Sequence, residues 1–482
     1  MFINTLQIST KRVNSSLSKV RTLSVSDKRG IAGGHNKMTE HQRNYVINHI
    51  NKFPRYKSHY CRAHRNEQEF LPVGTTLPLM YKLYNEETPK KDCVSFSSYR
   101  KIFLTEFNLR TKAPKKDTCN KCDTFQAKAQ STSSIEEKQL LKSEHDAHLL
   151  EAECARKQME ADLKEAFENN ELETLTFDME KTLPLPRLTT NIIFYKRQLW
   201  LYDCGIHSGK NNKAVCNLWI EGQAGRGAQE VGSCIKKYVK NNVPETVKRL
   251  ILWSDSCGGQ NRNIKIILMF KCVLEENPSL DSIQLKFLTS GHSFLPNDSD
   301  FGDIECALKR QQKLFSPEDY ANVIKGCRKR NPIEVVFLEK NDFVGTGNIE
   351  KLITNRKKDV NETKINWLQI KEIKIQQDKP YSIFIINMHN APDYSEINIK
   401  KRQGRPKNVD NHIIFLNNLE PLWPRGKPVA QAKLDDITSY LHLIPAADQP
   451  FYLHLTGDAI LEEDIDGYNV AALDFELESG SD

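Results

Sequence analysis

The sequence predicts an α/β protein with a mixed sheet in its central part, and two observations support this. Between about residues 171 and 340, apolar runs of strand length alternate with runs of helix length. Polar residues and glycines punctuate these runs, as they do at the ends of strands. In the clearest case, over 250–263, an apolar strand ends at Asp255, a Gly258-Gly259 pair breaks it, and a helix begins at Asn263. A largely helical region precedes this part.

The central part contains eight expected elements. In order, they are strands over 174–180, 191–207 and 213–221, a helix over 227–240, a strand ending at 255, a helix to about 276, a strand over 282–288 and a helix over about 299–312. This βββαβαβα order is that of the ribonuclease H-like fold. The fold class is therefore expected to be α/β, with a ribonuclease H-like mixed-sheet central domain.

Acids stand where a ribonuclease H-like domain needs them: on the first strand, after the fourth strand and on the last helix. The candidates are Asp178, Asp255 and one of Asp298, Asp300, Asp303 or Glu305. Three carboxylates at one rim of the sheet could bind two divalent metals, and Mg²⁺ or Mn²⁺ suits such oxygen ligands. Asp298 is the preferred third ligand because it lies where loop becomes helix, and Glu305 is the second choice. The simpler interpretation of Asp255 is a helix cap.

A second enzyme class fits the same region. Asp178-Met-Glu180 resembles the Asp-x-Glu opening of a 3′–5′ exonuclease on the same fold. Glu180 would join Asp178 on the metals, because residues i and i+2 of a strand share a face. His292, six residues before Asp298, would then be the general base.

A CxxC pair at Cys119 and Cys122 has the spacing of a zinc knuckle. Two thiolates at this spacing can occupy adjacent corners of a tetrahedron, so further ligands are needed. His145 and His148 are three residues apart on an expected helix and share one face, which makes them the first choice. The competing pair is His59 and Cys61. Two reduced cysteines in a turn are the simpler interpretation.

Charge divides the chain of 482 residues unevenly. Of the net charge of +7, the leader 1–37 carries +6 and the tail 457–482 carries −9, which leaves +10 for residues 38–456. A body this basic favours a polyanionic partner such as DNA, although a solvated basic surface is the simpler interpretation. Within it, a loop with some likeness to an AT-hook could enter a minor groove through Arg402, Arg405 and Lys407. Gln403 replaces an arginine of that motif.

The expected organisation follows from these shifts in composition. It comprises a disordered basic leader over 1–37, a helical region that could bind DNA over 38–118, the CxxC module and a long charged helix over 119–170, the catalytic domain over 171–340, a C-terminal α+β region over 341–456 and a disordered acidic tail over 457–482. The long helix could form a coiled-coil contact, which leaves a homo-oligomer open. No apolar run is long enough to span a membrane, and the twelve scattered cysteines favour a reducing compartment. We expect the nucleus, with mitochondrial targeting by the leader as the alternative.

Five blocks of the chain carry a resemblance: Ser58–Arg62, Phe107–Leu109, Pro114–Cys119, Trp253–Asn263 and Gly291–Asp298. They resemble one large, uncharacterised animal family that is abundant in insects and often multicopy, and the similarity covers most of residues 40–455. The core of that family resembles DDE/D-type transposases, with Asp178, Asp255 and Asp298 at matching places. The resemblance implies a transposon-derived protein that performs two-metal hydrolysis and strand transfer on DNA. The alternatives are the exonuclease and a catalytically silent, domesticated DNA-binding protein.

Overall fold

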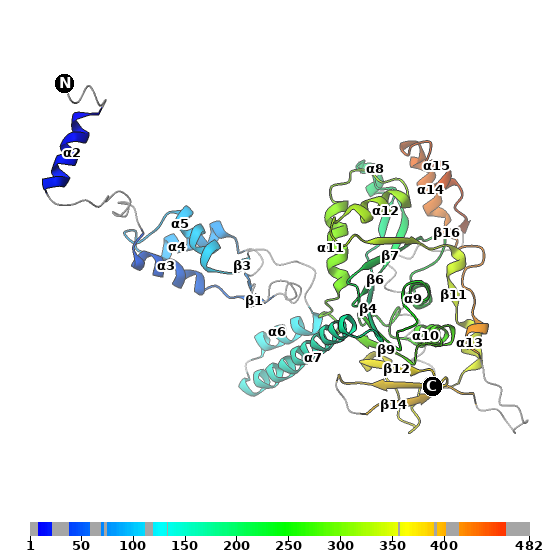
Figure 1. Ribbon diagram of the computed structural model, residues 1–482. Coiled ribbons are helices and arrows are strands. Elements are labelled where there is room, and N and C mark those ends of the chain that lie inside the picture. Colours follow the sequence, from blue (N-terminus) through cyan, green and yellow to red (C-terminus); the bar gives the residue numbers. More distant parts are fainter. Residues whose placement is uncertain are drawn as a thin grey trace, which may run out of the picture. The chain divides into compact units, whose positions relative to one another are not determined.

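A computed structural model of the chain describes residues 8–21, 38–57, 69–71, 75–110, 119–132, 134–354, 357–389, 393–401 and 414–458. The chain forms two compact units, residues 1–117 and 118–482 (Figure 1). The sequence predicts no structure in the leader, yet its described part forms helix α2 (Thr10–Arg21), which has no buried residue. Val13, Leu17 and Val20 recur there at helical spacing, and this local pattern accounts for the helix.

The rest of the first unit is a small helical domain. It contains α3 (Glu40–Asn51), α4 (Leu77–Glu87), α5 (Phe96–Glu106) and the short strands β1 (Tyr56–Lys57), β2 (Glu69–Phe70) and β3 (Leu109–Arg110). A capping box of Thr39 and Gln42 opens α3, and Ser95 caps α5. Buried Tyr84 and Tyr99 lie in its core with apolar residues of all three helices.

A large mixed sheet organises the second unit. Its strand order is β10-β7-β6-β4-β8-β9-β12-β13-β14. The strands are β4 (Leu172–Met179), β6 (Leu199–Ser208), β7 (Ala214–Ile220), β8 (Arg249–Ser254), β9 (Ser282–Phe287), β10 (Glu334–Phe337), β12 (Glu372–Gln376), β13 (Ser382–Ile386) and β14 (Ser395–Asn398). β4, β8 and β9 run parallel, whereas β6 is antiparallel to both β4 and β7. The predicted α/β class is therefore confirmed, and this arrangement is compatible with a ribonuclease H-like fold.

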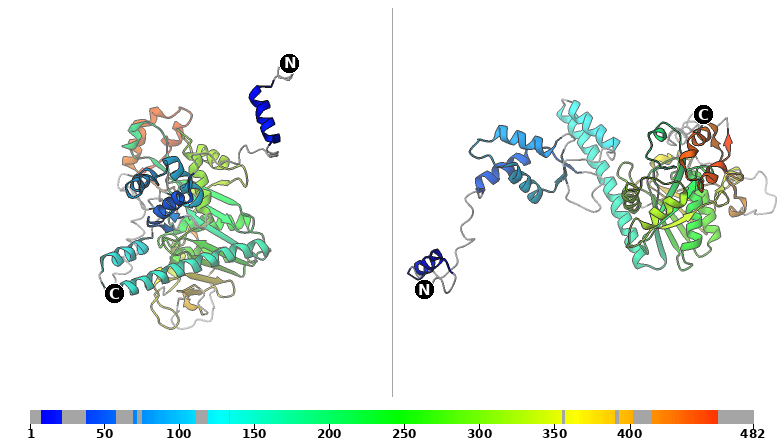
Figure 2. Two further views of the ribbon diagram at one scale, coloured as in Figure 1. Left: turned by 90° about the vertical axis from the view of Figure 1, so that its left-hand side faces the viewer. Right: turned by 90° about the horizontal axis from the view of Figure 1, so that it is seen from above.

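Helices cover both faces of the sheet (Figures 1 and 2). α9 (Ala228–Asn242) and α10 (Ile264–Glu276) pack on one face, where Leu250 and Leu252 of β8 point. α11 (Pro296–Leu308) and α12 (Pro317–Gly326) pack on the other. The alternating residues Ile251 and Trp253 of β8 contact the long helix α7 (Ile135–Glu168), so α7 lies on the same face as α11.

The remaining elements of this unit are shorter. They are α6 (Asn120–Ser131), α8 (Asn191–Phe194), α13 (Gly347–Leu352), α14 (Gln431–Tyr440), α15 (Gln449–Leu453), β5 (Leu183–Leu185), β11 (Val344–Gly345), β15 (Glu420–Pro421), β16 (Val429–Ala430) and β17 (Gly457–Asp458). The expected strand over 191–195 is wrong, because these residues begin a single helical turn, α8, before β6. Among the described residues, no helix combines the length and apolar character needed to cross a membrane.

Candidate metal centres

Asp178 is the next-to-last residue of β4 and faces the side of the sheet that α11 covers. Its neighbours Leu175 and Phe177 point into the core beneath α9 and α10, so residues 176 and 178 point the other way. Thr176 shows this directly, because its hydroxyl donates to the side-chain oxygen of Asn297 on α11 at 2.6 Å. The carboxylate of Asp178 accepts a hydrogen bond from the backbone N–H of Met179 at 2.8 Å.

Asp255 follows directly after β8, which runs parallel to β4 and next to it. Its Oδ1 accepts hydrogen bonds from the N–H of Cys257 at 3.1 Å and from Nδ2 of Asn261 at 2.6 Å. Asn263 caps α10 by accepting the N–H of Ile266, so the helix-cap interpretation of Asp255 is wrong. Asp255 instead organises the loop between strand and helix.

Asp298 lies in the first turn of α11 and accepts the N–H of Leu295 at 2.9 Å. Burial raises the pKa of Asp178 well above its usual range, and the charges of Asp255 and Asp298 raise it further. Burial also raises the pKa of Asp255, against the opposing effects of the Cys257 N–H, Asn261 and Arg262. β4 and β8 are adjacent and parallel, so Asp178 and Asp255 lie at the same edge of the sheet, and the hydrogen bond between Thr176 and Asn297 brings the start of α11 to β4.

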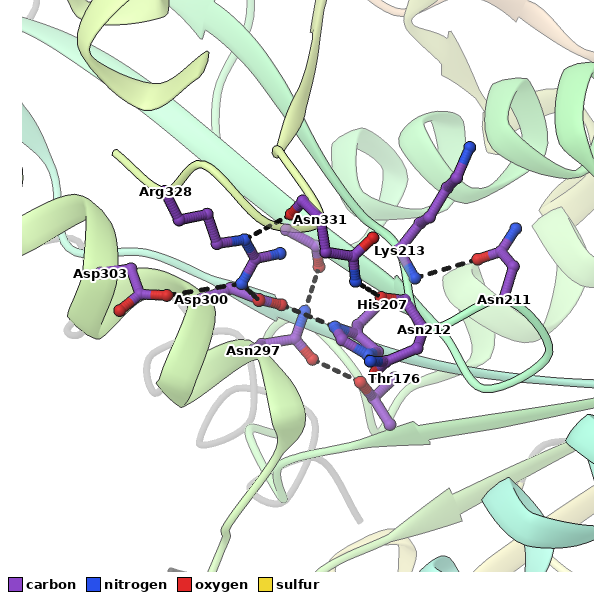
Figure 3. A network of polar contacts seen from close by, with 11 residues as sticks. Thr176, His207, Asn211, Asn212, Lys213, Asn297, Asp300, Asp303, Arg328 and Asn331 are labelled. Atoms are coloured by element: carbon purple, nitrogen blue, oxygen red, sulfur yellow. Dashed lines mark hydrogen bonds and ion pairs between the residues drawn. The ribbon is translucent and has the colours of Figure 1, made fainter. Parts of the chain in front are cut away.

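The other acids of α11 have different partners. Oδ2 of Asp300 lies 2.7 Å from Nδ1 of His207, and its Oδ1 accepts from Nη1 of Arg328 at 2.6 Å (Figure 3). Asp303 lies 3.5 Å from the same arginine nitrogen. Glu305 forms an ion pair with Lys181. Both oxygens of Asp300 are therefore bound within a structural network. Asp298 is the acid of α11 whose charge raises the pKa of Asp178.

Glu180 directly follows β4, and its N–H donates to the carbonyl of another acid, Asp203 of β6, at 2.9 Å. Burial and then the charge of Asp203 raise the pKa of Glu180 to about 9. Burial raises the pKa of Asp203 to about 7. No described N–H or O–H group donates to any of the four carboxyl oxygens of this pair. Sequence reasoning missed Asp203, although an acid inside an apolar strand was a usable signal.

Two cysteines and two histidines form the tightest group of ligand atoms in the described part of the chain. The donor atoms of Cys119, Cys122, His148 and His292 all lie within 4.8 Å of one another, and all four residues are buried. Nε2 of His148 is 3.2 Å from Sγ of Cys119, and Nε2 of His292 is 3.4 Å from Sγ of Cys122. The two Nε2 atoms are 3.1 Å apart. This group could bind a metal such as zinc.

The structure changes the predicted ligand set by one residue. His145 lies with its ring 5.5 Å from that of Phe125 on α6 and is not in the group, so its prediction as a ligand is wrong. His292, predicted as an alternative general base, takes its place. No sequence pattern joins residues 148 and 292, which meet only through tertiary packing. His59 and Cys61 lie outside the described residues.

Local conformation explains how these four residues meet. Cys119 occupies the N-cap position of α6 and Cys122 its first turn, while His148 comes from α7. His292 ends a turn in which its N–H donates to the carbonyl of Thr289 at 2.9 Å. Gly291 in this turn has φ +76°, and an added Cβ would lie 2.8 Å from Cα of Cys119. Only glycine meets both conditions without strain.

The predicted nucleic-acid residues Arg402, Arg405 and Lys407 lie outside the described residues. Comparison of the chain with protein-family models, with curated proteins and with solved structures finds no match. Function must therefore be argued from the two sites themselves.

Proposed function

We propose that residues 118–482 contain a ribonuclease H-like domain that cleaves and transfers phosphodiester strands of DNA with divalent metals, as DDE/D-type transposases do. One arrangement carries the proposal: Asp178 near the end of β4, Asp255 directly after the adjacent parallel strand β8, and Asp298 in the first turn of α11, which is bonded to β4 through Asn297 and Thr176. The strand order β7-β6-β4-β8-β9, with β6 antiparallel to its neighbours, supports it. Action on DNA implies a place in the nucleus.

The residues at this site fit a hard divalent cation such as Mg²⁺ or Mn²⁺. Three half-buried carboxyl groups repel one another, and a cation among them would favour their ionised forms. Bound there, such ions would activate the attacking water or hydroxyl and stabilise the leaving oxygen. The N–H of Cys257 and the amide of Asn261 hold Asp255 in one orientation. Asp298 is oriented in the same way by the N–H of Leu295.

The exonuclease alternative requires Glu180 on the metals and His292 as the general base. Glu180 interacts with Asp203 instead, and His292 lies against Cys122 and His148. These contacts favour the transposase-like proposal. A catalytically silent DNA-binding protein is the third candidate, since Asp178, Asp255 and Asp298, here called the carboxyl trio, could persist without activity.

One experiment separates the three. The full chain is incubated with Mg²⁺ or Mn²⁺, a labelled DNA with a free 3′ end and a plasmid target, beside Asp255→Asn. The matched control is Asp303→Asn, which alters a half-exposed acid on the same helix as Asp298. We expect strand transfer by the wild type and the control and none by Asp255→Asn. Stepwise shortening would favour the exonuclease, and binding alone would favour the silent derivative.

We also propose that Cys119, Cys122, His148 and His292 bind one zinc ion. Zn–S and Zn–N bonds in a tetrahedron place two nitrogens about 3.3 Å apart and a nitrogen and a sulfur about 3.6 Å apart. The observed separations of 3.1, 3.2 and 3.4 Å come close to these values. Metal analysis should find about one zinc per chain, since the site offers one tetrahedron. Zinc should be lost in Cys119→Ser/Cys122→Ser and kept in His145→Ala.

A further inference from the structure

The Cys/His group joins three segments that are distant in the sequence. Cys119 and Cys122 open α6, His148 belongs to α7, and His292 lies in the loop between β9 and α11. Two of these segments belong to one helical hairpin, and the third leads to the carboxyl trio. A metal at this position therefore bridges the hairpin and the loop that precedes Asp298.

The loop over 288–295 is held from two sides. On one side, the N–H of Leu288 donates to the carbonyl of Ser254 at 3.0 Å, next to Asp255. On the other side, Sγ of Cys119 lies 3.6 Å from the carbonyl of Ser290, and His292 joins the Cys/His group. After β9, the loop thus passes the end of β8 and then the Cys/His group before it enters α11.

The end of this loop contacts Asp298 directly. Leu295 belongs to the same buried apolar cluster as Ala155 and Met159 of α7, and its N–H donates to the Asp298 carboxylate. The body of α11 has a separate attachment, because Nδ2 of Asn297 donates to the carbonyl of Gly205 at 3.0 Å. What depends on the Cys/His group is therefore the course of residues 288–295 and the donor that orients Asp298.

We infer that a zinc ion bound by Cys119, Cys122, His148 and His292 positions the carboxyl trio. It fixes the loop over 288–295, and this loop orients Asp298 toward Asp178 and Asp255. The effect on divalent-metal binding rests on the function proposed above. Without the zinc, the loop loses an anchor and the Leu295 N–H is no longer held beside Asp298. His292 acts in this arrangement as a zinc ligand and not as a base.

Hydrogen–deuterium exchange of the full chain tests the first step without any activity assay. Zinc-loaded and chelator-stripped protein are compared in the absence of Mg²⁺. We expect faster exchange over 285–300 after zinc removal and unchanged exchange over β6 and β7, residues 199–220. Equal exchange over 285–300 in both forms would overturn the inference.

The second step, the effect of zinc on Mg²⁺ binding, is tested by titrating Mg²⁺ and recording the melting temperature. The quantity compared is the Mg²⁺ concentration that gives half of the maximal rise. Loss of an orienting group around a metal site typically weakens affinity roughly 10- to 100-fold, and we expect a shift of that size in His292→Ala. The control is His145→Ala, a histidine on α7 outside the group. An unshifted Mg²⁺ response in zinc-free His292→Ala overturns the inference. If His292→Ala does not fold, the same titration is made on zinc-stripped wild type, with refilling by zinc as its control.

These results separate the two proposals. If Mg²⁺ leaves the melting temperature of zinc-loaded wild type unchanged, the proposed catalytic function fails, whatever the loop does. If wild type responds to Mg²⁺ equally with and without zinc, the catalytic proposal stands and the positioning inference fails.

Discussion

Glu180, the residue after β4, is joined to Asp203 of β6 by a hydrogen bond from its N–H to the Asp203 carbonyl at 2.9 Å, and both acids are buried. Their pKa values are raised to about 9 and about 7, against about 4 for such groups in an unfolded chain. The folded state therefore binds more protons than the unfolded state between about pH 4 and pH 9. The stability that these acids contribute is complete below about pH 4 and is lost as the pH rises through 7 to 9.

The first prediction concerns this pair. Asp203→Asn removes one of the two charges, so the melting temperature should rise at pH 8 relative to wild type and fall less steeply between pH 5 and pH 9. Each 1 kcal/mol is worth about 2–4 °C in a domain of this size. Calorimetry across that pH range provides the measurement, with Asp303→Asn as the control. A wild-type melting temperature that increases from pH 6 to pH 9 would contradict the prediction.

The second prediction concerns Asp255. Asn keeps an oxygen that can accept the Cys257 N–H, and it removes a charge that raises the pKa of Asp178. The metal-free Asp255→Asn protein should therefore be at least as stable as wild type. Millimolar Mg²⁺ should stabilise wild type, because a ligand that binds only the folded state raises its stability, but should leave the variant unchanged. Thermal melts with and without Mg²⁺ test this. If Mg²⁺ raises the melting temperatures of the two proteins equally, Asp255 is not a ligand of the metal.

The third prediction distinguishes Asp300 from Asp298. Asp300 is buried and links His207 to Arg328, so Asp300→Asn should destabilise the fold by roughly 2–4 kcal/mol while the Mg²⁺ shift persists. Denaturant unfolding measures the first effect and thermal melting the second. Adding Arg328→Gln should recover part of the loss, because the arginine left without its carboxylate is then removed. A variant that loses the Mg²⁺ shift but not stability would place Asp300 at the metals.

The fourth prediction concerns DNA. The +10 charge of residues 38–456 should give binding to duplex DNA that weakens steeply with salt. Replacing Arg402, Arg405 and Lys407 by Gln should lower the affinity and reduce the slope of log K against log salt by up to about 3, roughly one for each phosphate that is no longer neutralised. Fluorescence anisotropy at several salt concentrations tests this. Binding that does not depend on salt would count against any role with nucleic acid.

Much of the architecture could be read from the sequence because its signals are local. The apolar run that ends at Asp255 and the helix that begins at Asn263 lie within about a dozen residues of each other, and both interpretations gave the right element. The run over 191–195 failed because Ile192 and Ile193 suit a strand or a helix equally, and only the packing around them decides.

The sites were harder to predict because they combine distant segments. Cys119 and Cys122 are neighbours in the chain, and the CxxC spacing alone identified them. His145 and His292 were exchanged because i, i+3 spacing says which residues share a helix face but not which face meets a partner. Asp203 was missed for the same reason, since its significance depends on its pairing with Glu180.

Gly291 restricts how the start of α6 and the turn before α11 can change in sequence. A side chain at residue 291 would strain the backbone, because φ there is +76°, and its Cβ would lie 2.8 Å from both Cα and Cβ of Cys119. Every amino acid has that Cα, so replacing the two cysteines makes no room for a side chain at 291. Glycine should therefore be required at this position whether or not a metal is bound, and Gly291→Ala should displace the turn from α6 even in a protein that lacks the CxxC pair.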